Sequence, residues 1–284
     1  MSATKLNMRC HLATLIFIAQ LFFSTSAGAA TIELKDYNTE LSVNGEMQAG
    51  DAERIISLVL ASRVFDKVGQ GVYQLQNISI NSKGGDIGEA LKIASFVRAT
   101  YLNLSVRGGE KGTPSVCASA CFFVYIAAYS RHANGVDIKV DWRLNFSQGL
   151  VGIHRPYYLV PQGGLASQAR QDDVMRSVRS SLQLEGISQH LIDEMMAHPS
   201  NDVYWLTRRD IESIGEFKPS VEEELISKCG YKRWNLLTDT DLASTQRGRI
   251  VGQCQAQLWW KTYWPMGIVA LERMRLGWRP WDAK

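Results

Sequence analysis

The side chains that could do chemistry lie closest together in VCASACFFVYIAA, residues 116–128. Within this stretch Ser119 stands between Cys117 and Cys121, just before a long apolar run. Three kinds of site would explain such a bracket: a zinc site, a disulfide, or a serine nucleophile presented at a turn. Other parts of the sequence must distinguish these three kinds of site.

A zinc site is the least favoured of the three. Structural zinc needs four ligands at recognisable spacing, and this C-x3-C pair has neither a second C-x-x-C nor an H-x-x-x-H beside it. A cysteine nucleophile would need a basic neighbour, and neither cysteine has one. Disulfides and two buried free thiols remain as alternatives. We therefore expect no metal and no cofactor.

The N-terminus bears on the state of the cysteines. Lys5 and Arg9 precede LATLIFIAQLFF, an apolar run that small residues follow. This pattern predicts a secretory signal peptide over residues 1–30, and the run is short for a membrane span. An uncleaved anchor is the alternative. A periplasmic or secreted location would leave four cysteines in an oxidising compartment, which favours disulfides.

Length and composition set broad limits. The 284 residues are enough for one substantial domain with an appendage, and 45% of them are hydrophobic, as in globular proteins. The formal net charge of +3 is too small to argue for nucleic acid. We expect no nucleic-acid partner.

A double glycine offers a second element of a site. The stretch ISINSKGGDIGEALKIASF reads as a strand, a turn at Gly84 and Gly85, and a helix that begins near Asp86. Paired glycines let backbone N–H groups approach a substrate, and a helix start adds positive potential. The turn could form an oxyanion hole, or it could be a simple tight turn between a strand and a helix.

One histidine offers a third element. His154 in GIHRP follows an apolar strand, where an imidazole can be held rigidly. His11 belongs to the expected signal peptide, and the other three histidines lie in polar helix or loop contexts. A structural histidine is the alternative interpretation of His154.

The order of elements predicts an α/β fold with mainly parallel pairing, because strands alternate with crossover helices. Strands are expected over 73–81, 102–108 and 150–156, and helices over 86–101 and 120–131. Further helices are expected over 165–186, 188–197 and 207–215. From residue 222 the composition shifts toward cysteine and tryptophan. We therefore expect a domain over 31–221 and a small helical module over 222–284.

Taken in order, the three motifs resemble those of the Clp protease proteolytic subunit, within the wider Clp/crotonase superfamily. The family's INSPGG segment is matched by INSKGG at 80–85, with Lys83 in place of proline. Its serine elbow is matched by Ala-Ser-Ala at 118–120, and its histidine by Ile-His-Arg-Pro at 153–156. The resemblance covers about residues 40–218.

The resemblance implies a spiral of β-β-α units with a mainly parallel sheet. It implies Ser119 as the nucleophile and His154 as its base. The backbone at Gly84, Gly85 and Ala120 would stabilise the oxyanion, with the N–H groups of Gly85 and Ala120 as donors.

The third residue of the family's site is less well matched. The family places an aspartate shortly before a helix, and an ungapped alignment puts Val203 in that position. Asp202 lies one residue away and is the expected orienting acid. A longer connection between serine and histidine, the flanking cysteines and the C-terminal tail also depart from the family.

The cysteines then have an expected pairing. Cys117 and Cys121 straddle a strand-to-helix turn, so their Cα atoms can lie within the range that a disulfide needs. Such a bridge would clamp the turn that presents Ser119. Cys229 and Cys254 would form the second bridge, with Cys10 removed in the signal peptide.

Three functions remain open on this basis. The favoured one is an exported serine hydrolase, a Clp-like peptidase acting on a peptide or protein. The second is a catalytically silent Clp-like domain that binds a peptide or a partner protein. The third is a crotonase-like enzyme acting on a thioester, which export disfavours because acyl-CoA is cytosolic. A Ser–Lys dyad would have Lys83 as its nearby lysine, and a homo-oligomer stays open.

The tail QLWWKTYWPMGIVALERM allows two interpretations. Its aromatic residues either lie at a membrane interface, as a weak contact, or pack onto the α/β domain as a cap. A stapled compact module suits packing better, so the cap is favoured.

Overall fold

The computed structural model describes residues 29–36, 39–62, 75–107, 113–133, 149–157, 168–232 and 245–282. All but the last two residues of the expected signal peptide lie outside this part of the chain.

The main sheet has five strands in the order β1-β2-β3-β4-β6. The first pair is antiparallel and the other three pairs are parallel. Alternate residues of β2 to β4, among them Leu41, Ile78 and Leu104, are fully buried. The strands are β1 (Thr31–Lys35), β2 (Glu40–Asn44), β3 (Asn77–Asn81), β4 (Asn103–Val106) and β6 (Arg131–His132).

A smaller sheet holds β5 (Ser115–Ala118), β7 (Gly149–Ile153) and β8 (Tyr204–Trp205). β5 and β7 are parallel, and β8 pairs antiparallel with β7. The two sheets meet just after β3, where the Ser82 N–H donates to Val116 O at 2.7 Å and the Ala118 N–H donates to Ser82 O at 3.0 Å. The chain segments that follow β3 and β5 therefore lie together.

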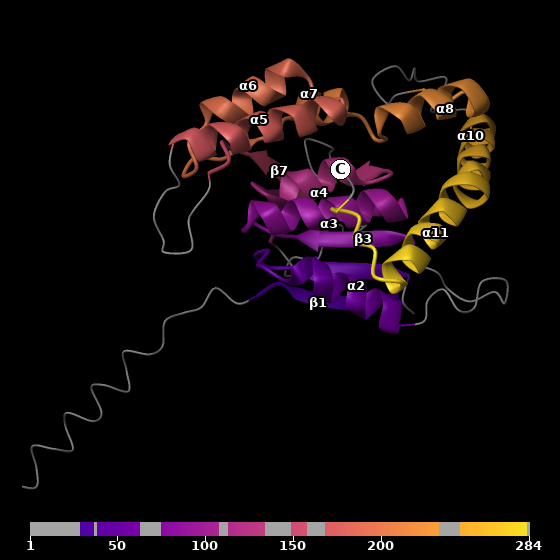
Figure 1. Cartoon of the computed structure of the whole chain (residues 1–284). Coiled ribbons are helices and arrows are strands. Elements are labelled where there is room, and N and C mark those ends of the chain that lie inside the picture. The colour runs from indigo at the N-terminus through magenta and orange to yellow at the C-terminus, as the bar shows by residue number, and fades with distance from the viewer. Residues whose placement is uncertain are drawn as a thin grey trace, which may run out of the picture.

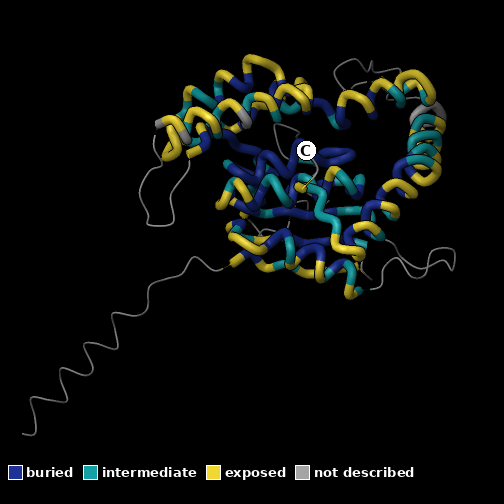
Figure 2. Tube along the Cα trace, viewed as in Figure 1, coloured by how far each residue is buried: buried dark blue, intermediate teal, exposed yellow. Residues whose placement is uncertain are grey.

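Helices follow the strands as the alternating pattern predicts. Figure 1 shows α3 and α4 beside the strands, with α5 to α7 as a separate layer beyond them. Figure 2 shows that the buried residues concentrate in the strands and in the inner helices. The helices of the domain are α2 (Asp51–Ala61), α3 (Ile87–Thr100), α4 (Cys121–Ala127), α5 (Gln168–Leu184), α6 (Gln189–Ala197) and α7 (Arg208–Ile214). This is the expected mixed α/β class with a mainly parallel sheet.

Local signals placed most of these elements correctly. Asp86 caps α3, accepting a hydrogen bond from the Glu89 N–H at 2.8 Å, as expected from its position. One expected helix was too long. It ends at Ala127, and Arg131–His132 instead pairs with β4 as β6. The two-residue strand β8 was not predicted, because so short a segment has no periodicity to detect.

The C-terminal segment packs against the α/β domain. It forms α8 (Pro219–Cys229), α10 (Thr245–Leu258), a π-helical turn (Trp259–Tyr263) and α11 (Trp264–Arg275). The expected boundary after residue 221 falls inside α8. Aromatic residues of the π turn join Tyr129 and Phe217 in one hydrophobic cluster, while Leu271 and Met274 of α11 enter the main core.

Close backbone approach explains how α11 fits. A Cβ on Gly267 would lie 2.8 Å from the Thr100 carbonyl oxygen at the end of α3, so glycine is needed there. The Trp259 indole N–H donates to the Tyr101 carbonyl oxygen at 3.2 Å. Of the described helices, none is long and apolar enough to cross a membrane.

Candidate active site

Ser119 occupies a strained turn between β5 and α4. Its φ of 57° lies in the left-handed region, which non-glycine residues rarely adopt. The Ser119 N–H donates to Gly152 O of β7 at 3.0 Å, and the Ser119 O accepts from the Phe122 N–H at 3.0 Å. The residue is partly exposed, whereas both neighbours are buried. Such strain is typical of residues held for function, and it presents the hydroxyl at the surface of the turn.

The Gly84–Gly85 turn lies directly against this serine. A Cβ on Gly84 would lie 2.6 Å from the Ser119 Cβ and 3.0 Å from its Oγ. A Cβ on Gly85 would lie 2.2 Å from the Met47 carbonyl oxygen. Both glycines have positive φ, at 110° and 125°. No other residue type fits either position without a shift of the backbone.

The hydrogen bonds of the turn decide which N–H groups are available. The Gly84 N–H donates to Ser82 Oγ at 3.1 Å. The Gly84 O accepts from the Met47 N–H at 2.8 Å, and this bond fixes the turn. Within the described residues, the N–H groups of Gly85 and Ala120 donate to no acceptor. The absence of a side chain at Gly84 therefore lets the turn lie close to Ser119. The backbone N–H groups of Gly85 and Ala120 are the donors that a substrate could use.

His154 lies at the end of β7 and is only 7% exposed. Its Nδ1 is 3.0 Å from the Arg155 carbonyl oxygen, and its ring stacks on Tyr157 with centroids 6.3 Å apart. A carbonyl oxygen can only accept, so this contact places the proton on Nδ1. In the neutral ring with this tautomer, the other nitrogen, Nε2, carries the lone pair and can act as a base.

Strand pairing brings the serine and the histidine to the same edge. β5 and β7 run parallel, with Ala118 opposite Gly152. Ser119 directly follows Ala118, and His154 lies two residues after Gly152. The described residues contain no hydrogen bond between Ser119 Oγ and His154. The two residues thus follow neighbouring strands at the same edge, and within the described residues no hydrogen bond joins their side chains.

Asp202 is occupied elsewhere. Its Oδ2 lies 3.1 Å from His198 Nδ1, and Glu194 lies 3.4 Å from the Nε2 of the same ring. Within the described part of the chain, no carboxylate forms a hydrogen bond or ion pair with His154. His198 instead contacts the His154 segment through its backbone, accepting the Arg155 N–H at 2.8 Å.

Both expected disulfides are present. Cys117 and Cys121 are bridged with Cα atoms 5.2 Å apart, and Cys229 and Cys254 with Cα atoms 5.6 Å apart. The first bridge closes over Ser119 and ties the end of β5 to the start of α4. The cysteines around the serine are therefore a clamp on the turn, and the described residues hold no cluster that could bind a metal ion.

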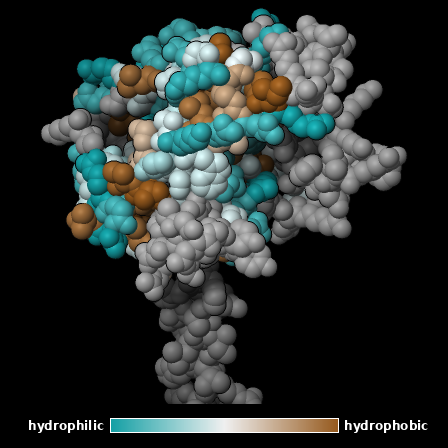
Figure 3. All heavy atoms as spheres, turned by 90° about the vertical axis from the view of Figure 1, so that its right-hand side faces the viewer, coloured by the Kyte–Doolittle hydropathy of each residue, from teal (hydrophilic) through white to brown (hydrophobic). Residues whose placement is uncertain are grey.

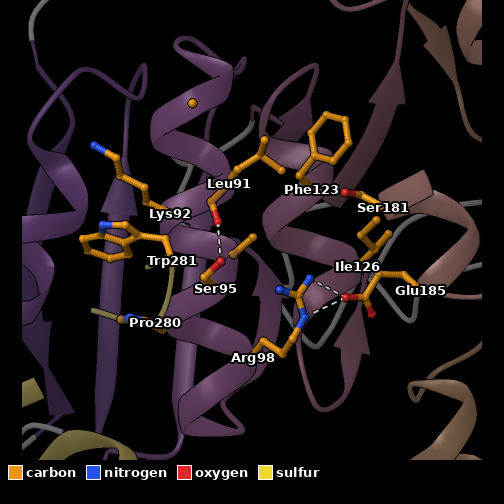
Figure 4. A pocket seen from close by; sticks show the side chains of 12 residues that line it. Leu91, Lys92, Ser95, Arg98, Phe123, Ile126, Ser181, Glu185, Pro280 and Trp281 are labelled. Atoms are coloured by element: carbon orange, nitrogen blue, oxygen red, sulfur yellow. Dashed lines mark hydrogen bonds and ion pairs between the residues drawn. The ribbon is translucent and has the colours of Figure 1, made fainter. Parts of the chain in front are cut away.

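A pocket of about 500 Å³ lies between α3, α4, α5 and the C-terminal residues Pro280 and Trp281 (Figure 4), and its lining includes neither Ser119 nor His154. Gly88 in its wall lies three residues after Gly85, and Phe123 lies four residues after Ser119. Figure 4 shows Lys92 beside Trp281 at one side and the Arg98–Glu185 ion pair at another. The remaining wall includes the apolar side chains of Leu91 and Ile126.

Buried charge lies behind the polar side of this pocket. Burial lowers the pKa of Lys218 to about 7, an effect that Glu185 opposes and that Arg98 and Arg131 reinforce. Arg131 is 3% exposed, and among the described residues its Nε and Nη2 have no hydrogen-bond partner. The charge near Glu185 therefore changes around neutral pH.

The glycine turn permits a stability test. Gly85→Ala is expected to lower the free energy of unfolding by several kcal/mol, because its Cβ would overlap a backbone oxygen and the φ is positive. Gly230→Ala is the matched control, since its φ is also positive, at 67°, but its Cβ would meet nothing within 4 Å. The control is expected to cost about 1 kcal/mol. Equal losses in chemical denaturation would show that the close approach at Gly85 is unimportant.

Comparisons with known proteins yield structural similarity only. No protein-family model matches the chain, and no curated protein matches it. A mutant of the 1510-N membrane-bound stomatin-specific protease is similar at 14% identity and a TM-score of 0.41, over 68% of this chain and 84% of that one.

Two further solved structures are similar at the same level. A ClpP1 mutant from Listeria monocytogenes shares 16% identity at a TM-score of 0.38, over 62% of this chain and 86% of that one. An enoyl-CoA hydratase from Mycobacterium avium subsp. paratuberculosis shares 12% identity at a TM-score of 0.33, over 87% and 97%. All three TM-scores are below 0.5.

Proposed function

We propose that this chain is an exported serine hydrolase, of the peptidase class, with Ser119 as nucleophile and His154 as general base. The observation that carries the proposal is the position of Ser119. Ser119 has a left-handed conformation, its Oγ lies 3.0 Å from where a Cβ of Gly84 would be, and it follows the strand that pairs with β7, just after which His154 lies. A buried structural serine would need neither the strain nor the paired glycines.

The reaction follows from the available groups. His154 Nε2 takes the proton of the Ser119 hydroxyl as Oγ attacks a carbonyl carbon, and it later gives that proton to the leaving group. The N–H groups of Gly85 and Ala120 stabilise the oxyanion, each donor being worth about 3 kcal/mol in comparable sites. Water then attacks the acyl-serine carbonyl as His154 takes its proton, the bond between the acyl carbon and Oγ breaks to release the acid, and the proton returns to Oγ.

The orienting group in this proposal is a backbone carbonyl. The Arg155 carbonyl oxygen lies 3.0 Å from His154 Nδ1 and accepts its proton, which leaves Nε2 to face the serine. His198 fixes the Arg155 peptide through its own carbonyl, and Asp202 fixes His198. Asp202 then acts as a positioning residue through His198. The sequence had suggested a direct contact between Asp202 and His154.

The pocket lined by the two helices that follow the turns at Gly85 and Ser119 supports a peptide or protein substrate. The apolar wall of this pocket, with Phe123 and Ile126, suits a large apolar side chain of the substrate. The cationic groups of Lys92 and Arg98 can donate hydrogen bonds to a polar group of the substrate. The two disulfides support export, because such bridges persist in oxidising compartments. The 1510-N protease is described as specific for stomatin, and no such substrate is proposed for this chain.

A silent binding domain is the second candidate, and one observation favours it. His154 lacks a carboxylate partner within the described residues, and its ring makes no hydrogen bond to Ser119. A peptide could then occupy the same turn without being cleaved. A Ser–Lys dyad has less support, because Lys83 is exposed and makes no hydrogen bond to Ser119 in the described structure.

Covalent labelling separates these candidates. The purified chain is incubated with a fluorophosphonate, which reacts only with activated serines, and its intact mass is measured. The hydrolase is expected to gain one phosphonyl group, and the Ser119→Ala variant none. An unlabelled wild-type chain with a native circular dichroism spectrum would favour the silent domain.

A further inference from the structure

One side of helix α11 is exposed although the other is buried in the core. The buried side includes Leu271 and Met274. The opposite side carries residues at i, i+3, i+7 and i+10 spacing, namely Met266, Val269, Arg273 and Leu276. Met266 is 49% exposed, Val269 59% and Leu276 84%. Packing against the domain therefore buries one side of α11 and leaves apolar side chains of the other side exposed.

Exposed apolar residues gather in this part of the molecule. Of the nine large hydrophobic residues exposed in the described chain, five lie within 245–282: Ile250, Trp260, Met266, Val269 and Leu276. Figure 3 views the molecule from the side on which Figure 1 places α10 and α11, and it shows hydrophobic side chains set among hydrophilic ones. Scattered single residues need no explanation, but a concentration in one segment does.

The same segment holds the excess positive charge of the protein. Residues 245–282 contain six basic residues (Arg247, Arg249, Lys261, Arg273, Arg275 and Arg279) and two acidic ones (Glu272 and Asp282), a net +4, against +3 for the whole chain. Arg275 is paired with Glu272, and Arg279 with Glu53. Among the described residues, Lys261 and Arg273 face no acidic partner, and Arg273 lies over the Trp278 ring at 4.3 Å.

We propose that the outer side of α10 and α11 docks on the surface of an anionic lipid bilayer. Aliphatic residues and an exposed tryptophan among unpaired cations are the composition of interfacial helices, which lie in the headgroup region without crossing it. Anionic headgroups supply the negative charge that Lys261 and Arg273 lack.

A second copy of the chain fits this face less well. In a two-fold interface the same patch meets itself, so the unpaired cations would face one another. Five exposed large apolar side chains are also too few for a stable dimer interface, which holds roughly 20–30 residues a side. This inference does not depend on the proposed hydrolase activity, since none of these residues belongs to the site around Ser119.

The test uses the mature chain without residues 1–30, because that apolar run would itself bind lipid. Binding to sedimented vesicles is compared for two lipid compositions at roughly 0.1 M salt. One is phosphatidylcholine with about 30% phosphatidylglycerol, and the other is phosphatidylcholine alone. We expect binding to the anionic vesicles that weakens as salt rises.

Two variants and two matched controls locate the surface. Lys261→Glu combined with Arg273→Glu is expected to weaken binding at least about tenfold, because each basic residue near an anionic surface contributes about fivefold. Met266→Gln with Val269→Gln and Leu276→Gln should do the same through lost apolar contact. Arg209→Glu in α7 and Leu184→Gln in α5, both at exposed positions, should leave binding unchanged.

Three results would overturn the proposal. The first is an absence of binding to anionic vesicles, and the second is binding that survives both sets of changes. The third is self-association, seen by light scattering, that the same changes abolish, because a second copy would then explain the exposed face. Fluorophosphonate labelling of the variants reports on the hydrolase separately, and we expect it to be unaffected.

Discussion

Ser119→Ala is expected to lower kcat/KM for an ester or peptide substrate by about 10⁴-fold or more, because a nucleophile has no substitute in covalent catalysis. His154→Ala should lower it by a similar factor. The double variant should be little worse than either single one, since residues that act as a unit lose their effect together. Initial rates on a chromogenic ester, with burst kinetics to count sites, measure these effects.

Two controls complete this prediction. Ser227→Ala, at an exposed position of α8, should leave the rate unchanged. Asp202→Asn should reduce kcat/KM less than about tenfold, because its carboxylate pairs with His198 and not with His154. A loss at Asp202 as large as that at Ser119 would show that this carboxylate contacts His154 in the working enzyme. An unchanged rate in Ser119→Ala would remove Ser119 from catalysis.

Deleting residues 222–284 is expected to leave a chain that does not fold cooperatively. The deletion removes a set of buried side chains from the two hydrophobic clusters: Leu225, Trp259, Tyr263, Trp264, Ala270, Leu271 and Met274. Fully burying one large apolar side chain is worth about 1.5–3 kcal/mol, and whole domains are stable by only about 5–15 kcal/mol. The expected result is aggregation, or loss of the thermal unfolding transition in calorimetry.

Point variants make this test quantitative. Met274→Ala, at a position 1% exposed, should cost about 2–5 kcal/mol in urea unfolding. Met266→Ala lies two turns earlier on the same helix at 49% exposure, and should change stability by less than about 0.5 kcal/mol. A truncated chain that stays soluble, monodisperse and unchanged in Tm would contradict the packing of the cap.

Much of the local structure around Ser119 could be predicted from the sequence because it is built from local signals. The paired glycines Gly84 and Gly85 predict a backbone conformation that other residues rarely adopt, and both have positive φ. A C-x3-C spacing across a turn suits one disulfide geometry, and the bridge is there. The strands and helices around them follow from runs of hydrophobic residues, and α4 is buried along its whole length.

The remainder depends on contacts between distant segments. The pairing of Asp202 with His198 depends on the turn at 199–202, in which the Asp202 N–H donates to Pro199 O at 3.0 Å. The acceptance of the His154 proton by a backbone carbonyl leaves no trace in residue types, because every residue has such an oxygen. The short strand β8 exists because β7 has a free edge, and its own sequence does not require it.

The most direct measurement of the central claim is a crystal structure of the chain after reaction with diisopropyl fluorophosphate. We expect phosphorus bonded to Ser119 Oγ, with the phosphoryl oxygen about 3 Å from the N–H groups of Gly85 and Ala120. His154 Nε2 should face the ester oxygen, with Nδ1 still bonded to the Arg155 carbonyl. An adduct on another residue, or a phosphoryl oxygen turned away from the glycine turn, would contradict the assignment of this site.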